Sequence, residues 1–148
     1  MNKADIHQAC ITHVESRTQR LQEEIAQLQD AVNNDTKSSA GDKFETGREM
    51  MTLELNKVGM QLAQANKMLQ MLSRIRPEQT LGKVAFGSLV KTNEGLYYFS
   101  VSLGKIIEGE TEFFALSMAS PIGAALGERG VGDKVDFMKR TIDIEAIV

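Results

Sequence analysis

Residues 40–46 read Ala-Gly-Asp-Lys-Phe-Glu-Thr and lie at the centre of a mirrored hydrophobic pattern. On both sides of this stretch, core-type side chains recur in steps that alternate between three and four residues, which is typical of a coiled-coil seam and not of a strand. When these positions are paired outward from the central stretch, the two residue numbers of every pair add to 83. The midpoint, 41.5, predicts that the chain folds back between Gly41 and Asp42. The seven pairs are Val32 with Met51, Leu28 with Leu55, Ile25 with Val58, Leu21 with Leu62, Thr18 with Ala65, Val14 with Leu69 and Ile11 with Leu72.

The segments that carry this seam have helix-forming compositions. Residues 3–35 contain neither Gly nor Pro and are rich in Gln, Glu, Arg, Ala and Leu, and residues 44–76 continue the pattern with only Gly47 and Gly59 interrupting it. Residues 33–41 are mostly Asn, Asp, Ser, Thr and Gly, which favour a turn. We predict an antiparallel helical hairpin over residues 1–76, with its tip near residues 41–45 and a paired seam roughly 30 Å long.

Two acids stand at the predicted tip. Asp42 and Glu45 have the spacing of a capping box, in which Asp42 caps the second helix and Glu45 reaches back to it. The same two carboxylates can instead act as functional acids held at the end of the hairpin. The two interpretations are compatible, because a cap fixes the acids in place.

The second half changes period after Pro77, which disfavours helix at the residue before it. Residues 77–80 form the predicted linker, and residues 81–148 are predicted to be a small α+β domain built mostly of antiparallel strands. Ser120 as N-cap, Pro121 as first helical residue and Gly127 as a left-handed terminator predict one short helix. Strands are expected at residues 84–91 (interrupted at Gly87), 96–103, 113–118, 134–137 and 141–147, with turns at 93–95 and 108–110.

Composition restricts the class of protein. The net charge of −3, from 17 basic and 20 acidic residues, gives no support for stable binding to bare DNA or RNA. The single Cys10 favours a reducing compartment, and the absence of a signal peptide or a long apolar run predicts a soluble, cytoplasmic protein that does not bind membranes. His7 and His13 flank Cys10 but lack the further ligands of a zinc site. We expect a monomer.

Three stretches of the second half resemble a known family. Residues 120–123 (Ser-Pro-Ile-Gly), 125–127 (Ala-Leu-Gly) and 131–135 (Val-Gly-Asp-Lys-Val) are similar to the SPIG…ALLG…VGD-V block of the bacterial Gre (GreA/GreB) transcription elongation and transcript-cleavage factors. Residues 86–90 resemble the FGS-V strand of the same domain, and residues 41–46 resemble the family's GDLSEN tip motif. The order and length of the parts also match, so the resemblance covers essentially the whole chain.

The resemblance implies a fold and a partner. The fold is an antiparallel coiled coil followed by an FKBP-like antiparallel-sheet domain with one short helix. The domain of residues 81–148 then docks at the rim of the secondary channel of bacterial RNA polymerase, with Ser120, Pro121, Ile122 and Gly123 as polymerase-binding residues. The hairpin enters the channel, where Asp42 and Glu45 help to hold a catalytic Mg²⁺ ion and orient the attacking water.

The implied chemistry belongs to the polymerase. The polymerase hydrolyses the 3′ end of a backtracked transcript, which the factor meets only indirectly, so the chain is an accessory factor and not an enzyme. It has no cofactor of its own and shares Mg²⁺ only when bound. A hard cation of this kind is commonly held by one or two carboxylates together with substrate phosphate, which fits two acids brought in by another protein.

The tip departs from the family pattern. Lys43 and Phe44 replace Leu-Ser between the acids, Thr46 replaces Asn, and residues 47–49 replace Ala-Glu-Tyr. A cation between the acids weakens metal capture, so the alternative is a Gre-fold regulator that occupies the channel without stimulating cleavage. An unrelated coiled-coil interaction protein and a prolyl isomerase are further alternatives; the isomerase rests on fold alone.

Overall fold

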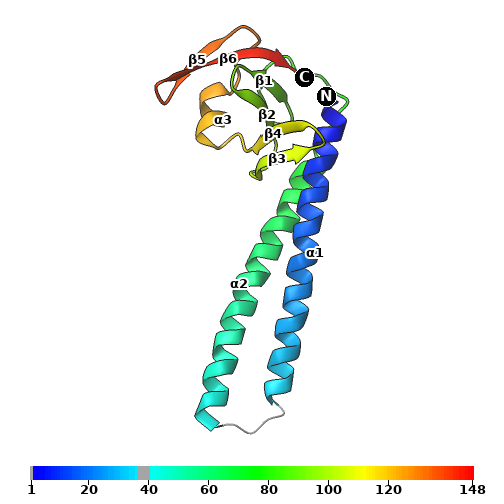
Figure 1. The fold of residues 1–148 in the computed structure, drawn as a ribbon, viewed down its shortest axis with the longest axis vertical. Coiled ribbons are helices and arrows are strands. Elements are labelled where there is room, and N and C mark those ends of the chain that lie inside the picture. Colours follow the sequence, from blue (N-terminus) through cyan, green and yellow to red (C-terminus); the bar gives the residue numbers. More distant parts are fainter. Residues whose placement is uncertain (1, 37–40) are drawn as a thin grey trace. The chain divides into compact units, whose positions relative to one another are not determined.

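The computed structural model describes the backbone of residues 2–36 and 41–148, and the side chains of residues 2–34 and 46–148. Two long helices, α1 (Lys3–Thr36) and α2 (Gly41–Ser73), precede a six-stranded sheet and one short helix (Figure 1). The predicted α+β class, with a helical hairpin followed by a sheet domain, is therefore confirmed. In the part of the chain that the structure describes, no helix is long and apolar enough to cross a membrane.

The apolar seam of the hairpin is the protected face of both helices. Val14, Val58 and Ala65 are at most 1% exposed, and Thr18 and Leu21 are at most 9% exposed. Toward the tip the seam is only half-buried, at Ile25, Leu28, Val32, Met51 and Leu55. Ile11, Leu62 and Leu69 are half-buried as well, so six of the fourteen predicted seam positions are buried, eight are half-buried and none is exposed.

The second helix ends earlier than predicted. It stops at Ser73, three residues before Arg76, because the amides of Arg74 and Ile75 bond the carbonyls of Met71 and Leu72 three residues back. Ile75 is 8% exposed, and its side chain lies against Gly87, so the chain leaves the helix to bury this side chain. The boundary is set by that tertiary contact and not by Pro77.

The chain divides into two compact units, which we call the sheet unit and the hairpin unit. The sheet unit comprises Met1–Thr12 and Gln70–Val148, and the hairpin unit comprises His13–Leu69. The first turns of α1 and the last turn of α2 thus belong to the sheet unit. The division predicted from the sequence, with residues 77–80 as the linker, stays a prediction.

The six strands form one sheet in the order β3-β4-β2-β1-β6-β5. Four of the five strand pairings are antiparallel as predicted, whereas β2 and β4 run parallel. Strand β3 lies at the edge of the sheet and β4 lies between β3 and β2, so the chain reverses at β3 and β4 then runs in the direction of β2. The strands are β1 (Leu89–Thr92), β2 (Gly95–Phe99), β3 (Gly104–Glu108), β4 (Thr111–Leu116), β5 (Lys134–Phe137) and β6 (Arg140–Ile147).

Two strand predictions were incomplete. The strand expected at residues 84–91 begins only at Leu89, because Gly87 has φ +93°, and Val84 instead exchanges backbone hydrogen bonds with Glu128 and Arg129. Strand β3 was not predicted, since its Gly-Lys-Ile-Ile-Glu sequence has no alternating pattern and only Ile106 is buried.

The core of the sheet unit lies between the sheet and the short helix α3 (Pro121–Leu126). The buried cluster joins the central strands, α3 and β6, and it consists of Val84, Val90, Tyr97, Phe99, Leu126, Val135, Ile142 and Ile144. Full burial of a side chain of this size contributes about 1.5–3 kcal/mol each. This cluster therefore fixes α3, and with it residues 120–123, against the sheet.

Candidate functional site

The predicted tip acids lie at the start of α2. The helix begins at Gly41, one residue before the predicted cap, a difference within the usual spread of helix boundaries. The side chains of Asp42 and Glu45 lie outside those that the structure describes, so both the capping box and the metal-binding role stay predictions. The first described side chain after them, Thr46, is exposed.

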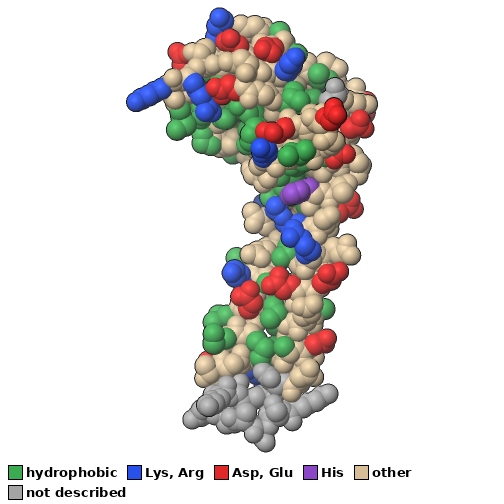
Figure 2. All heavy atoms as spheres, viewed as in Figure 1, with side chains coloured by type: hydrophobic (Ala, Val, Ile, Leu, Met, Phe, Trp, Pro, Cys, Tyr) green, Lys and Arg blue, Asp and Glu red, His purple; other side chains and the backbone are tan. Residues whose placement is uncertain are grey.

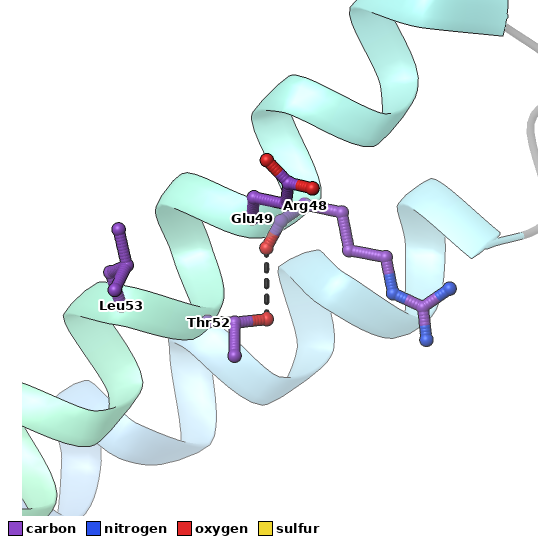
Figure 3. A pocket seen from close by; sticks show the side chains of 4 residues that line it. All are labelled: Arg48, Glu49, Thr52 and Leu53. Carbon is purple, nitrogen blue, oxygen red and sulfur yellow. Dashed lines mark hydrogen bonds between the residues drawn. The ribbon is translucent and has the colours of Figure 1, made fainter.

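A shallow depression lies on α2 one turn beyond the tip acids. Arg48, Glu49, Thr52 and Leu53 line this open space of about 500 Å³ (Figure 3). The Thr52 hydroxyl donates to the Arg48 carbonyl at 2.9 Å, and the Arg48 side chain extends away from Leu53. Arg48 and Glu49 carry opposite charges, so the described part of this surface is not an additional acidic site.

The predicted polymerase-binding residues form a capped helix start. Ser120 has an extended backbone (φ −65°, ψ 159°), and its Oγ accepts from the Gly123 amide at 3.0 Å. The same hydroxyl donates to the Ser117 carbonyl at 2.7 Å. Pro121 is the first helical residue, where a missing amide costs nothing. The predicted N-cap and Pro position are therefore confirmed.

Gly123 is required by a close backbone approach. A Cβ at this position would lie 2.5 Å from the Ser117 carbonyl oxygen and 2.6 Å from that of Met118. Real side chains do not tolerate such distances, and the neighbouring atoms are backbone. Gly123 is buried, Ser120 and Ile122 are half-buried, and Pro121 is exposed. Within this group a partner can thus reach Pro121 most readily, while Gly123 shapes the backbone.

The prediction that Gly127 is left-handed was wrong. Gly127 has φ −50°, and the left-handed residue is Glu128, one position later, at φ 67°. Glycine at 127 is explained instead by space, since a Cβ there would lie 3.1 Å from the Gly123 carbonyl oxygen, which accepts the Gly127 amide.

A buried polar pair joins α1 to the sheet within the sheet unit. His7 Nδ1 lies 2.7 Å from the Tyr98 hydroxyl, and both side chains are less than 9% exposed. Burial lowers the pKa of His7, and the nearby Lys3 lowers it further against an opposing effect of Glu78. Burial also raises the pKa of Tyr98, so both groups are neutral at pH 7. Sequence reasoning missed this pair, because 91 positions separate its members.

Lys3 makes a second buried connection at the base of α1. Its Nζ donates to the Gln79 carbonyl at 2.9 Å and the Val148 carbonyl at 3.0 Å. Burial lowers the pKa of this ammonium group, while Glu78 partly opposes the shift. Among the described residues, no group of three or more His, Cys, Asp or Glu side chains is placed to hold a metal ion. Lys3 and His7 thus connect the first turns of α1 to the rest of the sheet unit.

Comparisons with known proteins returned structures but no sequence match. No family model matches the chain, and no curated protein matches it significantly. Solved structures similar to it include the GreA factor homolog 1 (Gfh1) protein of Thermus thermophilus and a structure described as the transcription factor Gfh1. The first is 19% identical, over 93% of this chain and 94% of that one, with a TM-score of 0.39. The second is also 19% identical, over 93% and 92%, with a TM-score of 0.38.

Proposed function

We propose that the chain is a Gre-like transcription elongation factor that binds bacterial RNA polymerase at its secondary channel. The observation that carries this proposal is the Ser120–Gly123 block, in which cap, proline and close-approach glycine each have a physical role. It follows a helical hairpin in which every position of the mirrored seam is buried or half-buried. Both features agree with the sequence motifs that resemble the Gre family.

In this proposal the chain supplies groups and the polymerase performs the reaction. The sheet unit docks at the channel rim, and the hairpin carries Asp42 and Glu45 to the polymerase active site. There Asp42 and Glu45 would hold a Mg²⁺ ion together with the polymerase, and that ion would supply the activation of the water that attacks the backtracked transcript. Two-metal sites stabilise both the attacking and the leaving oxygen of such a displacement. The chain is therefore an accessory factor without an active site of its own.

A second candidate function is channel occupancy without cleavage. The sequence between the acids favours it, since Lys43 adds a positive charge where the cation must bind and Phe44 replaces a residue able to donate a hydrogen bond. Such a factor binds the polymerase through the same surfaces and blocks access to the channel.

Binding to the polymerase of the source organism tests both candidates at once. We expect the parent protein to bind core polymerase, and Pro121→Glu, which places a charge on the exposed first residue of α3, to bind more weakly. Ala119→Glu, also exposed but outside the four predicted contact residues, serves as the control. Absence of binding by the parent protein contradicts both candidates, and transcript cleavage distinguishes them.

A further inference from the structure

The turn between β5 and β6 has an unusual backbone for its residues. Phe137 pairs with Arg140, which leaves a two-residue loop of Met138 (φ 48°) and Lys139 (φ 66°). Two-residue hairpins with both φ values positive strongly prefer Asn-Gly or Asp-Gly, because other side chains are strained in that region. Strained residues of this kind are concentrated at functional sites. The turn therefore keeps two side chains at a cost in backbone energy.

Both side chains point into solvent. Met138 is 78% exposed, the highest value for a large apolar side chain among the residues that the structure describes. Lys139 is exposed as well, and no described residue forms an ion pair with it. Figure 2 shows Lys and Arg side chains near hydrophobic ones at the β5–β6 end of the sheet unit.

The β5–β6 hairpin that carries them is firmly braced. The Arg140 guanidinium lies 5.5 Å from the centre of the Phe137 ring, and its Nε is 3.2 Å from the Glu94 carboxylate. The Thr141 hydroxyl donates to Asp136 at 2.9 Å. Asn93 contributes two more hydrogen bonds, accepting from the Asp143 amide at 2.8 Å and donating to the Thr141 carbonyl at 3.1 Å. A braced turn loses little conformational entropy when it binds.

The β5–β6 hairpin also adjoins the helix proposed to meet the polymerase. Strand β5 contacts α3, and Phe137 and Ile122 pack against the same core cluster. Met138 directly follows Phe137, and Pro121 directly precedes Ile122, so the exposed residues of both elements adjoin side chains of the same cluster. Methionine adapts to irregular apolar surfaces, and an unpaired ammonium group favours a carboxylate on the partner.

We propose that Met138 and Lys139 form a second contact with RNA polymerase, in which Met138 enters an apolar depression and Lys139 pairs with a carboxylate at its edge. This inference rests on the proposed function, because the partner is the same. It adds a recognition element that no Gre-like motif in the sequence marks.

The test is the double variant Met138→Asn/Lys139→Gly, which supplies the residues that the turn geometry prefers. We expect its melting temperature to equal or exceed that of the parent, while its Kd for core polymerase rises about fivefold or more, as for loss of a central contact residue. If Met138 and Lys139 had only a structural role, the variant would not combine an equal or higher melting temperature with a higher Kd. Ile107→Thr, which removes a 64%-exposed apolar side chain from β3 at the opposite edge of the sheet, is the matched control and should leave Kd unchanged.

Lys139→Glu separates the contribution of Lys139 to binding from that of Met138. It should weaken binding and make Kd less sensitive to salt, because it removes one charge-assisted contact. An unchanged Kd in the double variant, with the parent protein bound, overturns this inference alone. If the parent protein does not bind polymerase, both the inference and the proposed function are overturned.

Discussion

Replacing Gly123 with alanine should destabilise the sheet unit by an amount that follows from the structure. The new methyl carbon would lie 2.5 Å and 2.6 Å from two backbone carbonyl oxygens, whereas ordinary contacts begin at 3.4 Å. Either α3 or residues 117–118 must therefore move by about 0.9 Å, roughly the shortfall in the shorter contact. Overpacking of this kind costs about 1–3 kcal/mol, and the same movement strains the Ser120 cap, which contributes about 1 kcal/mol.

We therefore expect Gly123→Ala to lower the free energy of unfolding by about 3 kcal/mol. For a domain of this size, that corresponds to a fall in melting temperature of about 12 °C or more. The only tyrosines, Tyr97 and Tyr98, lie in the sheet unit, and the chain has no tryptophan, so tyrosine fluorescence reports this unit selectively. Urea or thermal unfolding followed by that signal measures the effect.

A matched substitution separates the contact from the effect of alanine itself. A methyl carbon added at Gly82 would meet no atom within 4 Å, and Gly82 has no positive φ, so Gly82→Ala should stabilise the protein by about 0.4–1 kcal/mol. If the free energy of unfolding of Gly123→Ala lies within about 0.5 kcal/mol of the parent value, the close approach does not constrain α3 and the reasoning is refuted.

Three further predictions concern Lys3, His7 and Cys10, in the part of α1 that belongs to the sheet unit. The pKa of His7 in the folded state lies below its unfolded value of 6.5, so its contribution to stability is present above about pH 6.5 and is lost as pH falls through the folded pKa. The urea midpoint should therefore fall less on acidification in His7→Gln than in the parent protein, and an equal fall in both would contradict this contribution. Burial raises the pKa of the Cys10 thiol to about 12, so a thiol reagent should label it only upon unfolding, and rapid labelling of the native protein would contradict its burial. Lys3→Met should cost about 1–3 kcal/mol in urea unfolding, because it removes two part-buried hydrogen bonds from a charged donor, and an unchanged midpoint would show that these bonds contribute nothing net.

The hairpin was predictable because its signal is local and repetitive. The seam positions follow from a fixed step along each helix, while the pairing that the mirrored numbers imply stays a prediction. The start of α3 was predictable for the same reason, since Ser120 and Pro121 act on neighbouring backbone groups. These features need no knowledge of distant parts of the chain.

The features that were missed depend on distant contacts. The end of α2 at Ser73 reflects the packing of Ile75 against Gly87, and the parallel pairing of β2 with β4 depends on where β3 lies. The His7–Tyr98 pair likewise joins residues 91 positions apart. Spacing within a single sequence carries no signal for such pairs. The turn at residues 138–139 was missed because Met-Lys lacks the Asn-Gly signature of its geometry.

Transcript cleavage in stalled elongation complexes, formed with the polymerase of the source organism, tests the central claim most directly. We predict that the parent protein stimulates cleavage of the backtracked 3′ end in the presence of Mg²⁺. Asp42→Ala and Glu45→Ala should each abolish this stimulation while leaving binding to the polymerase intact. Binding without cleavage by the parent protein would leave only the channel-occupying alternative, and full cleavage by both alanine variants would contradict the role assigned to the tip acids.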